Sequence, residues 1–170
     1  RIRKLIGRGG MGSVYVAQQL SMDKPVALKV LSRVLSEDPN MVKRFNQEAL
    51  ACSRLRHPNT IRVFDYGKSE DGYLYLAMEL LEGKELSRVA KEEAPLPPRR
   101  VVNIARQLVK SIGEAHQLGL VHRDLKPENI FLCNFYGESD FVKVLDFGIA
   151  KFTEGRKDQE SITQTGIICG

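Results

Sequence analysis

Residues 122–129, with the sequence HRDLKPEN, concentrate chemically capable side chains near the middle of the chain. Pro127 prevents a continuous helix through them, so they are predicted to form a loop. Buried or half-buried charges cost free energy unless they have partners, which favours a functional role for this loop. We interpret Asp124 as a group that orients or deprotonates a hydroxyl, and Asn129 as a metal ligand. An ordinary polar loop between a helix and a strand is the alternative that this stretch alone leaves open.

A glycine-rich segment near the start of the chain is the second candidate. Residues 7–12 (GRGGMG) lie between two segments rich in apolar residues, 2–6 and 14–16. Glycines let backbone amides approach a phosphate closely, because no Cβ intrudes. A dinucleotide-binding segment of this kind should open a helix, whereas the β-branched and aromatic residues after Gly12 predict a strand. The segment therefore predicts a hairpin that folds over phosphates, and a glycine turn with a purely structural role is the alternative.

Lys29 interrupts an otherwise apolar run, 26–31, that predicts a strand. An edge lysine that faces solvent would explain it, but the helix that follows suggests a partner. Glu48 lies within the apolar stripe of that helix, between Met41 and Leu55 in angle. Because a carboxylate on a buried face needs a cation, we predict that Glu48 pairs with Lys29 and directs it toward phosphate oxygens. The alternative is that Glu48 lies at the edge of the apolar stripe, where water solvates its carboxylate.

Asp146, Phe147 and Gly148 follow a predicted strand. The strand delivers Asp146 to a turn in which Gly148 permits unusual dihedral angles. A carboxylate at this point, together with the amide oxygen of Asn129, would suit a hard cation such as Mg²⁺. An ordinary Asp-x-Gly turn is the alternative.

The first 81 residues contain the elements that must position the glycine segment and Lys29. Strands are expected on both sides of the glycine segment within 2–21, and at 24–31, 61–66 and 73–80. One helix precedes the fourth strand: Asp38 is predicted to cap it, Pro39 occupies its first position, and Pro58 stops it. Asp71 and Gly72 predict the turn between the last two strands.

Helical periodicity dominates after a break at 82–84, which we predict to be a hinge. A short helix is expected at 85–93 and a longer one at 101–115, with Gly119 at its end. Short strands are expected near 130–132 and 142–145, and the second of them leads to the turn at Asp146. We therefore divide the chain into two parts, 1–81 and 82–170.

The composition is that of an ordinary globular domain, with 170 residues, 42% of them hydrophobic and 28% charged. The net charge is +5, but no Lys/Arg run exceeds two residues and Trp is absent, so a nucleic-acid partner is not expected. Cys52, Cys133 and Cys169 are too far apart for a disulfide framework or a zinc site, which favours a reducing cytosol. No membrane-spanning stretch and no signal peptide are evident.

The candidates occur in one order along the chain: glycine loop, strand lysine, helix glutamate, HRDLKPEN and DFG. The sequence resembles the protein kinase family over nearly its whole length, with VALK in place of VAIK. The segments GRGGMGSVYVA, VHRDLKPENI and VLDFGIAK are most similar to bacterial serine/threonine kinases of the eukaryotic type. The resemblance implies a two-lobed α+β fold. Residues 1–81 would form an N-lobe with an antiparallel β-sheet and one major helix, and 82–170 the hinge and a truncated, mostly helical C-lobe.

The resemblance also implies a binding site for ATP. Met78 would be the gatekeeper, Glu79 and Leu81 would offer backbone hydrogen bonds to adenine, and Glu85 would bind the ribose. Phe131 stands where a smaller aliphatic residue often meets adenine, which puts details of the pocket shape in doubt. The full set of expected nucleotide-binding residues is Ile6, Gly7, Arg8, Gly9, Gly10, Met11, Gly12, Ser13, Val14, Ala27, Lys29, Met78, Glu79, Leu81, Glu85, Phe131 and Asp146.

By the same resemblance, the catalytic residues are Lys29, Glu48, Asp124, Lys126 and Asn129. Asp124 would accept or orient the substrate hydroxyl, and Lys126 would steady the transferring phosphoryl group. Mg²⁺, or Mn²⁺ as an alternative, would be held by Asn129 and Asp146. The position of Lys126, two after Asp124, is typical of the serine/threonine subgroup, so the expected substrates are Ser and Thr hydroxyls of proteins.

Regulation by phosphorylation is implied as well. Arg123 would pair with a phosphate on the activation loop, for which Thr163 and Thr165 are the candidates and Ser161 is a weaker one. An unmodified polar loop is the alternative. A dimer that phosphorylates itself in trans is a further expected partner.

The chain starts at Arg1 without a methionine and ends at Gly170 in a polar segment. We expect it to be a fragment of a longer cytoplasmic protein, which other segments could anchor to a membrane, and to be poorly stable and inactive alone. A pseudokinase or nucleotide-binding scaffold without turnover is the alternative function.

Overall fold

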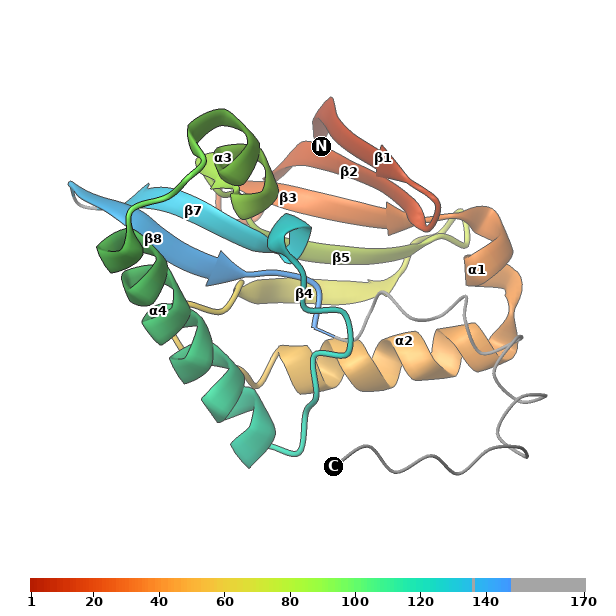
Figure 1. Ribbon diagram of the computed structural model, residues 1–170. Helices are drawn as coiled ribbons and strands as arrows, with labels where there is room; N and C mark the ends of the chain where they lie inside the picture. The colour runs from red at the N-terminus through yellow and green to blue at the C-terminus, as the bar shows by residue number, and fades with distance from the viewer. Residues whose placement is uncertain (136, 148–170) are drawn as a thin grey trace.

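The computed structural model describes residues 1–135 and 137–147. Five antiparallel strands in the first part of the chain form one sheet in the order β1-β2-β3-β5-β4 (Figure 1). Their bounds are β1 Ile2–Gly9, β2 Gly12–Gln19, β3 Lys24–Leu31, β4 Val63–Lys68 and β5 Leu74–Glu79. Gly9 pairs with Gly12 across the turn between β1 and β2, so the predicted glycine hairpin is confirmed.

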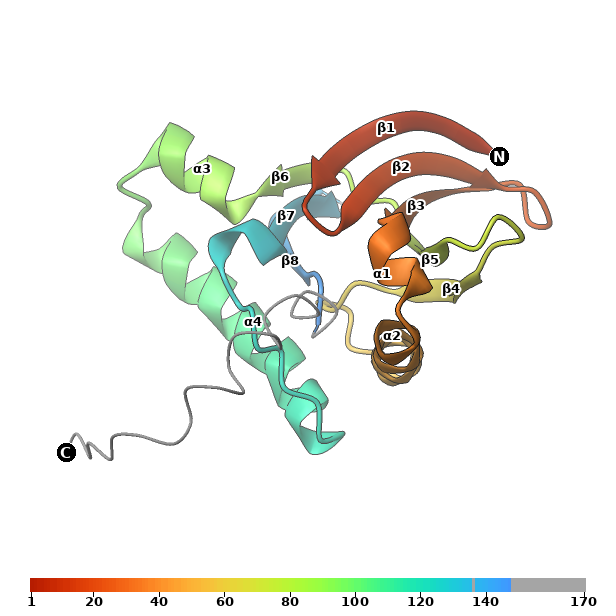
Figure 2. The same ribbon diagram turned by 90° about the vertical axis from the view of Figure 1, so that its right-hand side faces the viewer.

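Two helices lie between β3 and β4: α1 (Arg33–Glu37) and α2 (Pro39–Cys52). Asp38 caps α2 as predicted, because its Oδ1 accepts hydrogen bonds from the backbone amides of Asn40 and Met41 at 2.8 and 3.3 Å. Figure 2, which views α2 nearly along its axis, shows the helix against the sheet beside β4. Phe45 and Ala49 are fully buried there, as the apolar stripe predicted. Helix α1 was not predicted, since five residues are too few to show a period.

The second part of the chain contains a three-stranded antiparallel sheet in the order β6-β7-β8. Its strands are β6 Gly83–Glu85, β7 Ile130–Phe135 and β8 Glu138–Val144, and its helices are α3 (Leu86–Glu93), α4 (Pro98–Gln117) and the 3₁₀ turn η1 (Pro127–Asn129). Gly83, within the segment predicted to be a hinge, pairs with Cys133 as the first residue of β6, a strand that was not predicted. A Cβ at Gly83 would lie 2.1 Å from the carbonyl oxygen of Leu132, so this pairing requires glycine.

Helix α4 packs along β8 and buries Ile104, Ser111 and Ala115 (Figure 1). It ends where predicted, because Gly119 has a φ of 73° and the amide of Leu120 bonds back to the carbonyl of Ala115 at 2.8 Å. No helix in the described part of the chain is both long and apolar enough to cross a membrane.

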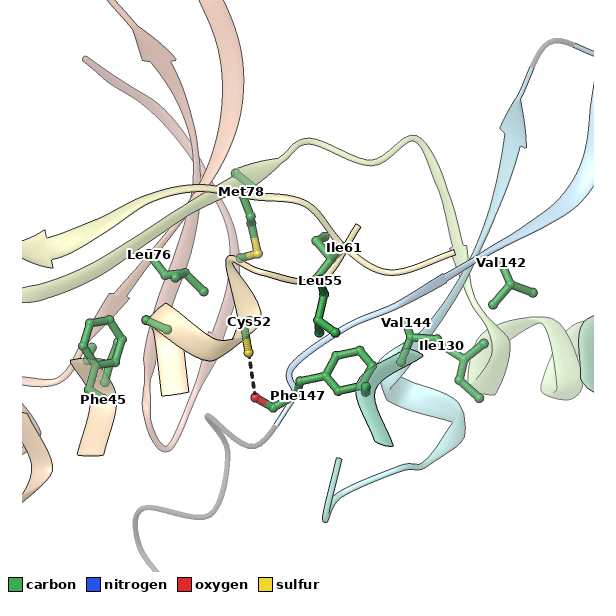
Figure 3. Packing of buried hydrophobic residues seen from close by; sticks show 14 of the residues in the cluster. Phe45, Cys52, Leu55, Ile61, Leu76, Met78, Ile130, Val142, Val144 and Phe147 are labelled. Atoms are coloured by element: carbon green, nitrogen blue, oxygen red, sulfur yellow. Dashed lines mark hydrogen bonds between the residues drawn. The ribbon is translucent and has the colours of Figure 1, made fainter. Parts of the chain in front are cut away.

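The loop after α2 joins the two sheets. The amide of Ile61 donates to the carbonyl of Val144 at 2.9 Å, and the amide of Val144 donates to the carbonyl of Asn59 at 2.7 Å. Around this junction a single apolar cluster extends from Leu76 and Met78 of β5 to Val144 of β8 (Figure 3). The two sheets therefore share one core, which fixes the loop that follows α4 relative to β3.

Candidate functional site

The loop between α4 and η1 is anchored through His122. The His122 side chain is buried; its Nε2 donates to the carbonyl of Leu145 at 2.7 Å, and its ring lies 4.7 Å from that of Phe147. Arg123 has a φ of 61°, and the amide of Asp124 donates to the carbonyl of His122 at 2.8 Å, which closes a three-residue turn. A positive φ at a non-glycine residue is unfavourable, so the His122 contacts must hold this turn in place.

The turn brings three predicted catalytic residues together. The Asp124 carboxylate accepts from Lys126 Nζ at 2.9 Å and from Asn129 Nδ2 at 3.1 Å, and Nδ2 also donates to the Asp124 carbonyl at 2.7 Å. The Lys126 ammonium is the main cause that lowers the pKa of Asp124 below its ordinary value, and the amide of Asn129 adds to it. Asp124 is thus an ionised, oriented acceptor, which is what a group that positions a hydroxyl needs.

Lys29 and Asp146 join the two sheets at the same place. Lys29 Nζ lies 2.8 Å from Asp146 Oδ1, although 117 residues separate them in the sequence. Lys29 is only 9% exposed on β3, and Asp146 follows β8 with a φ of 52°. The predicted turn at Asp146 therefore has a strained backbone, and the lysine from the first sheet is its partner.

The predicted pair between Glu48 and Lys29 is wrong for this structure. Lys29 bonds Asp146, and Glu48 Oε2 is buried without a hydrogen-bond partner among the described residues. Burial is the main cause that raises the pKa of Glu48, while the charges of Arg123 and Arg44 oppose it. Periodicity correctly placed Glu48 on a half-buried face of α2. It does not fix the distance from α2 to β3, and Asp146 competes for the same ammonium.

Asn129 and Asp146, the two residues predicted to hold a metal, belong to segments that are hydrogen-bonded to each other. The amide of Leu145, next to Asp146, donates to the carbonyl of Asn129 at 2.9 Å. The Asn129 amide nitrogen is occupied by Asp124, and no described residue donates to its Oδ1. Asp146 adds a carboxylate. No group of three or more His, Cys, Asp or Glu among the described residues could hold a metal alone. Two hard oxygen donors fit Mg²⁺, which takes few protein ligands and completes its shell with water and substrate phosphates.

The glycines of the β1–β2 hairpin fall into two kinds. A Cβ built at Gly9 or Gly10 meets nothing within 4 Å, so the space above them is open. Gly12 has a φ of 152°, and its Cβ would lie 2.1 Å from the carbonyl oxygen of Val30. The carbonyl of Met11 is held by the amide of Ser32 at 2.9 Å. The close pairing of β2 with β3 therefore requires glycine at position 12, while Gly9 and Gly10 leave room for a ligand.

The residues predicted to surround the base come from adjacent strands. Val14 pairs with Lys29, and Ala27 pairs with Met78, so β2, β3 and β5 bring them side by side. In the second sheet Glu85 pairs with Phe131. Ile6 lies on β1 and Leu81 on the connection between the sheets. The structure therefore places Val14, Ala27 and Met78 on adjacent strands of the first sheet and Glu85 opposite Phe131 in the second.

Two contacts at the site were missed by sequence reasoning. The Cys52 thiol of α2 donates to the carbonyl of Phe147 at 3.3 Å, and Phe147 lies between Leu55 and Val144 (Figure 3). Lys143 of β8 bonds Glu79 at 2.6 Å. A charged residue within the apolar run at 142–145 was the available signal for Lys143, the same signal that identified Lys29.

Of the predicted regulatory residues, only Arg123 belongs to the described part of the chain, where it is exposed. Thr163, Thr165 and Ser161 lie outside the described residues. The predicted contact between Arg123 and a phosphorylated threonine stays a prediction.

Known proteins are similar to this chain in sequence and in structure. The protein kinase domain family matches residues 1–167. The chain is 51% identical over its whole length to the serine/threonine-protein kinase pkn3 of Myxococcus xanthus, of which it covers 31%. It is 39% identical to PrkC of Bacillus subtilis, of which it covers 25%. The chain thus spans about a third or less of the length of these curated relatives.

The crystal structure of the Mycobacterium tuberculosis PknI kinase domain superposes with a TM-score of 0.77 at 33% identity. The match covers 88% of this chain and 59% of that one. These similarities confirm the two-lobed α+β fold and the resemblance to bacterial serine/threonine kinases. The chain belongs to the protein kinase family.

Proposed function

We propose that the protein transfers the γ-phosphoryl group of ATP to Ser and Thr hydroxyls of protein substrates. The observation that carries this proposal is the contact between Lys29 and Asp146 at 2.8 Å. It joins the sheet that bears the glycine hairpin to the segment after β8. The loop that bears Asp124 is bonded to the same segment, because His122 Nε2 donates to the carbonyl of Leu145 at 2.7 Å. A phosphate-binding lysine and a hydroxyl-orienting carboxylate would thus serve one site. Phosphoryl transfer depends mainly on such positioning and on electrostatic stabilisation.

ATP binding is proposed to use both parts of the chain. The open space at the Cβ positions of Gly9 and Gly10 supports a phosphate position against the hairpin. Lys29 would contact the phosphates, and Glu79 and Leu81 would offer backbone hydrogen bonds to adenine. The proposed division puts 1–81 in the N-lobe and 82–170 in the hinge and C-lobe. The pairing of β6 with β7 supports this division, because the chain joins the second sheet from Gly83 onward.

In the catalytic loop, Asp124 would orient the substrate hydroxyl and accept its proton, and Lys126 would turn from Asp124 toward the transferring phosphoryl group. Asn129 and Asp146 would hold Mg²⁺, with Mn²⁺ as an alternative. When bound, the metal would neutralise the negative charge of the ATP phosphates. The oxygen donors that these residues present support the metal assignment.

Regulation and partners belong to the same proposal. Arg123, exposed and held at a positive φ, would bind a phosphate on Thr163 or Thr165. A second copy of the protein would supply that phosphate in trans. We propose a cytoplasmic location for the catalytic domain.

The test uses the full-length protein that carries this sequence, incubated with Mg-ATP and protein substrates, and phosphosite mapping by mass spectrometry. Asp124→Asn should retain ATP affinity and lower transfer about 10²- to 10⁴-fold, the usual contribution of a positioned acid–base group. The matched control is Asp71→Asn, in the exposed turn between β4 and β5, which should transfer at the wild-type rate. Unchanged transfer by Asp124→Asn would refute the role of Asp124.

A nucleotide-binding scaffold is the second candidate. One observation favours it, namely that Lys29 pairs with Asp146 while Glu48 has no partner for Oε2 among the described residues. Measurable ATP binding without phosphate on Ser or Thr of the protein or of added substrates would support the scaffold over the kinase.

A further inference from the structure

Glu79 has three hydrogen bonds that fix it at the junction of the two sheets. Its Oε1 accepts from Lys143 Nζ at 2.6 Å and from the backbone amide of Arg62 at 2.7 Å. Its own backbone amide donates to the carbonyl of Arg62 at 2.9 Å. Both the main chain and the side chain of the last residue of β5 are therefore held, just before the connection to the second sheet. We call Glu79, Lys143 and the backbone of Arg62 the hinge clamp.

The ion pair of the hinge clamp needs an explanation beyond stability. Lys143 is 9% exposed, and it lies on β8, 64 residues from Glu79 in the sequence. Removing two charges from water costs about as much as their attraction returns, so apolar residues could stabilise this position equally well. Within residues 1–135 and 137–147, only two ion pairs join residues up to 81 with residues after it, and the other is between Lys29 and Asp146. A part-buried charge pair at this place is better explained by the geometry that it imposes.

The geometry at stake is that of the connection after β5. Glu79 and Leu81 are the residues whose backbone groups are proposed to bind adenine, and hydrogen bonds lose strength steeply when donor and acceptor are misaligned. Lys143 draws the Glu79 side chain toward β8, while Arg62 holds it toward the loop before β4. Rotation of the peptide after Glu79 is therefore resisted from two directions.

We infer that Glu79 and Lys143 are positioning residues that align the backbone of 79–81 with the edge of adenine and so set the preference for adenine over guanine nucleotides. This inference rests on the proposed ATP-binding function. Lys143 acts through Glu79 and does not touch the nucleotide. A preorganised backbone discriminates between bases because the wrong base leaves its donors and acceptors unpaired. A loosened backbone can adapt, so discrimination falls while the rest of the site is intact.

The test measures the affinities of ATP and GTP for the full-length protein by competition with a fluorescent ATP analogue. Lys143→Met and Glu79→Gln should each weaken ATP binding about tenfold, the effect of impairing one or two hydrogen bonds, and should change GTP binding less than about twofold. The side-chain amide oxygen introduced by Glu79→Gln can still accept from the backbone amide of Arg62, so that variant isolates the ion pair. Because Lys143 acts through Glu79, the double variant should be no worse than either single variant.

The matched control is Asp140→Asn. Asp140 lies three residues before Lys143 on the same strand and pairs with Arg100 of α4, away from the connection at 80–82. Its φ of 59° suits asparagine, so the change removes one part-buried ion pair without backbone strain. Thermal unfolding of every variant shows which ones are folded, and Glu79→Gln carries the test if Lys143→Met does not fold.

Loss of the ATP preference in the two clamp variants, with Asp140→Asn unchanged, supports the inference. Folded clamp variants that keep the wild-type ratio of affinities overturn it, as does an equal loss of both nucleotides or a similar loss in Asp140→Asn. A wild-type protein that binds neither nucleotide would refute the proposed function itself, which separates the two failures.

Discussion

Replacing Gly12 by alanine should destabilise the protein, whereas replacing Gly10 should impair ATP binding instead. An alanine at Gly12 would place its Cβ 2.1 Å from the carbonyl oxygen of Val30 and 2.9 Å from the Cα of Leu31. Both are backbone atoms of β3, so no side chain can turn away, and the φ of 152° adds strain. Overpacking against a rigid wall costs about 1–3 kcal/mol, and the upper end applies here. For a protein of this size that corresponds to a fall in Tm of about 6–12 °C.

Gly10 provides the contrast, because nothing lies within 4 Å of its Cβ position. Gly10→Ala should change the stability by less than about 0.5 kcal/mol, as surface substitutions usually do. Its methyl group would occupy the space through which a phosphate approaches the backbone, so ATP affinity should fall. Thermal unfolding and competition binding with a fluorescent ATP analogue measure the two effects separately. Full ATP affinity in Gly10→Ala would refute the assignment of this hairpin as a phosphate cover, and an unchanged Tm in Gly12→Ala would refute the steric argument.

Three further predictions concern Lys29, Glu48 and the buried cysteines. Lys29→Met should lower phosphoryl transfer about 100-fold, as loss of one charge-stabilising donor does, whereas Lys24→Met at the exposed end of the same strand should not. Glu48→Gln should raise Tm at neutral pH, because burial raises the pKa of Glu48 above 4.5 and the ionised carboxylate therefore lowers the free energy of unfolding as the pH rises. The gain in Tm should vanish below pH 4.5, where Glu48 is protonated in both the folded and the unfolded protein. A gain in Tm that does not depend on pH would contradict this reasoning. Cys52 and Cys133 should resist iodoacetamide in the native protein, since burial raises their pKa values to about 12 and about 11. Peptide mapping after alkylation checks this, and labelling of Cys52 before unfolding would contradict it.

The sequence predicted the first sheet well because its signals are local. Alternating β-branched residues and glycines define β1 to β3, and Asp38 with Pro39 marks the start of α2. Helix α1 escaped notice because it is shorter than two turns. Strand β6 was missed because Gly83 looks like a chain break in the sequence, whereas its missing side chain lets β6 approach Leu132.

In the candidate site too, contacts within one segment were easier to predict than contacts between distant segments. Asp124, Lys126 and Asn129 lie within one loop, and in the structure Asp124 contacts both of the others. Pairs formed between distant elements were harder to predict, because a helical period gives an angle about an axis and no distance to a strand. The burial of Glu48 was foreseen, but the pairing of Lys29 with Asp146 instead of Glu48 was not.

The Lys29 ammonium has two possible partners at the site, the carboxylates of Asp146 and Glu48, and in this structure it bonds Asp146. Lys29 Nζ contacts Asp146, so it cannot at the same time satisfy Glu48, whose buried Oε2 has no partner among the residues described. Asp146 is also a proposed metal ligand, and a bound cation would compete with Lys29 for its oxygens. Lys29 would then be free to approach Glu48, where a buried carboxylate gains most from a positive charge. Glu48 should therefore matter more to nucleotide turnover than to folding: Glu48→Gln should lower phosphoryl transfer in the protein whose Tm it raises. A variant that gained stability and kept full transfer would show that Glu48 never pairs with Lys29 during the reaction.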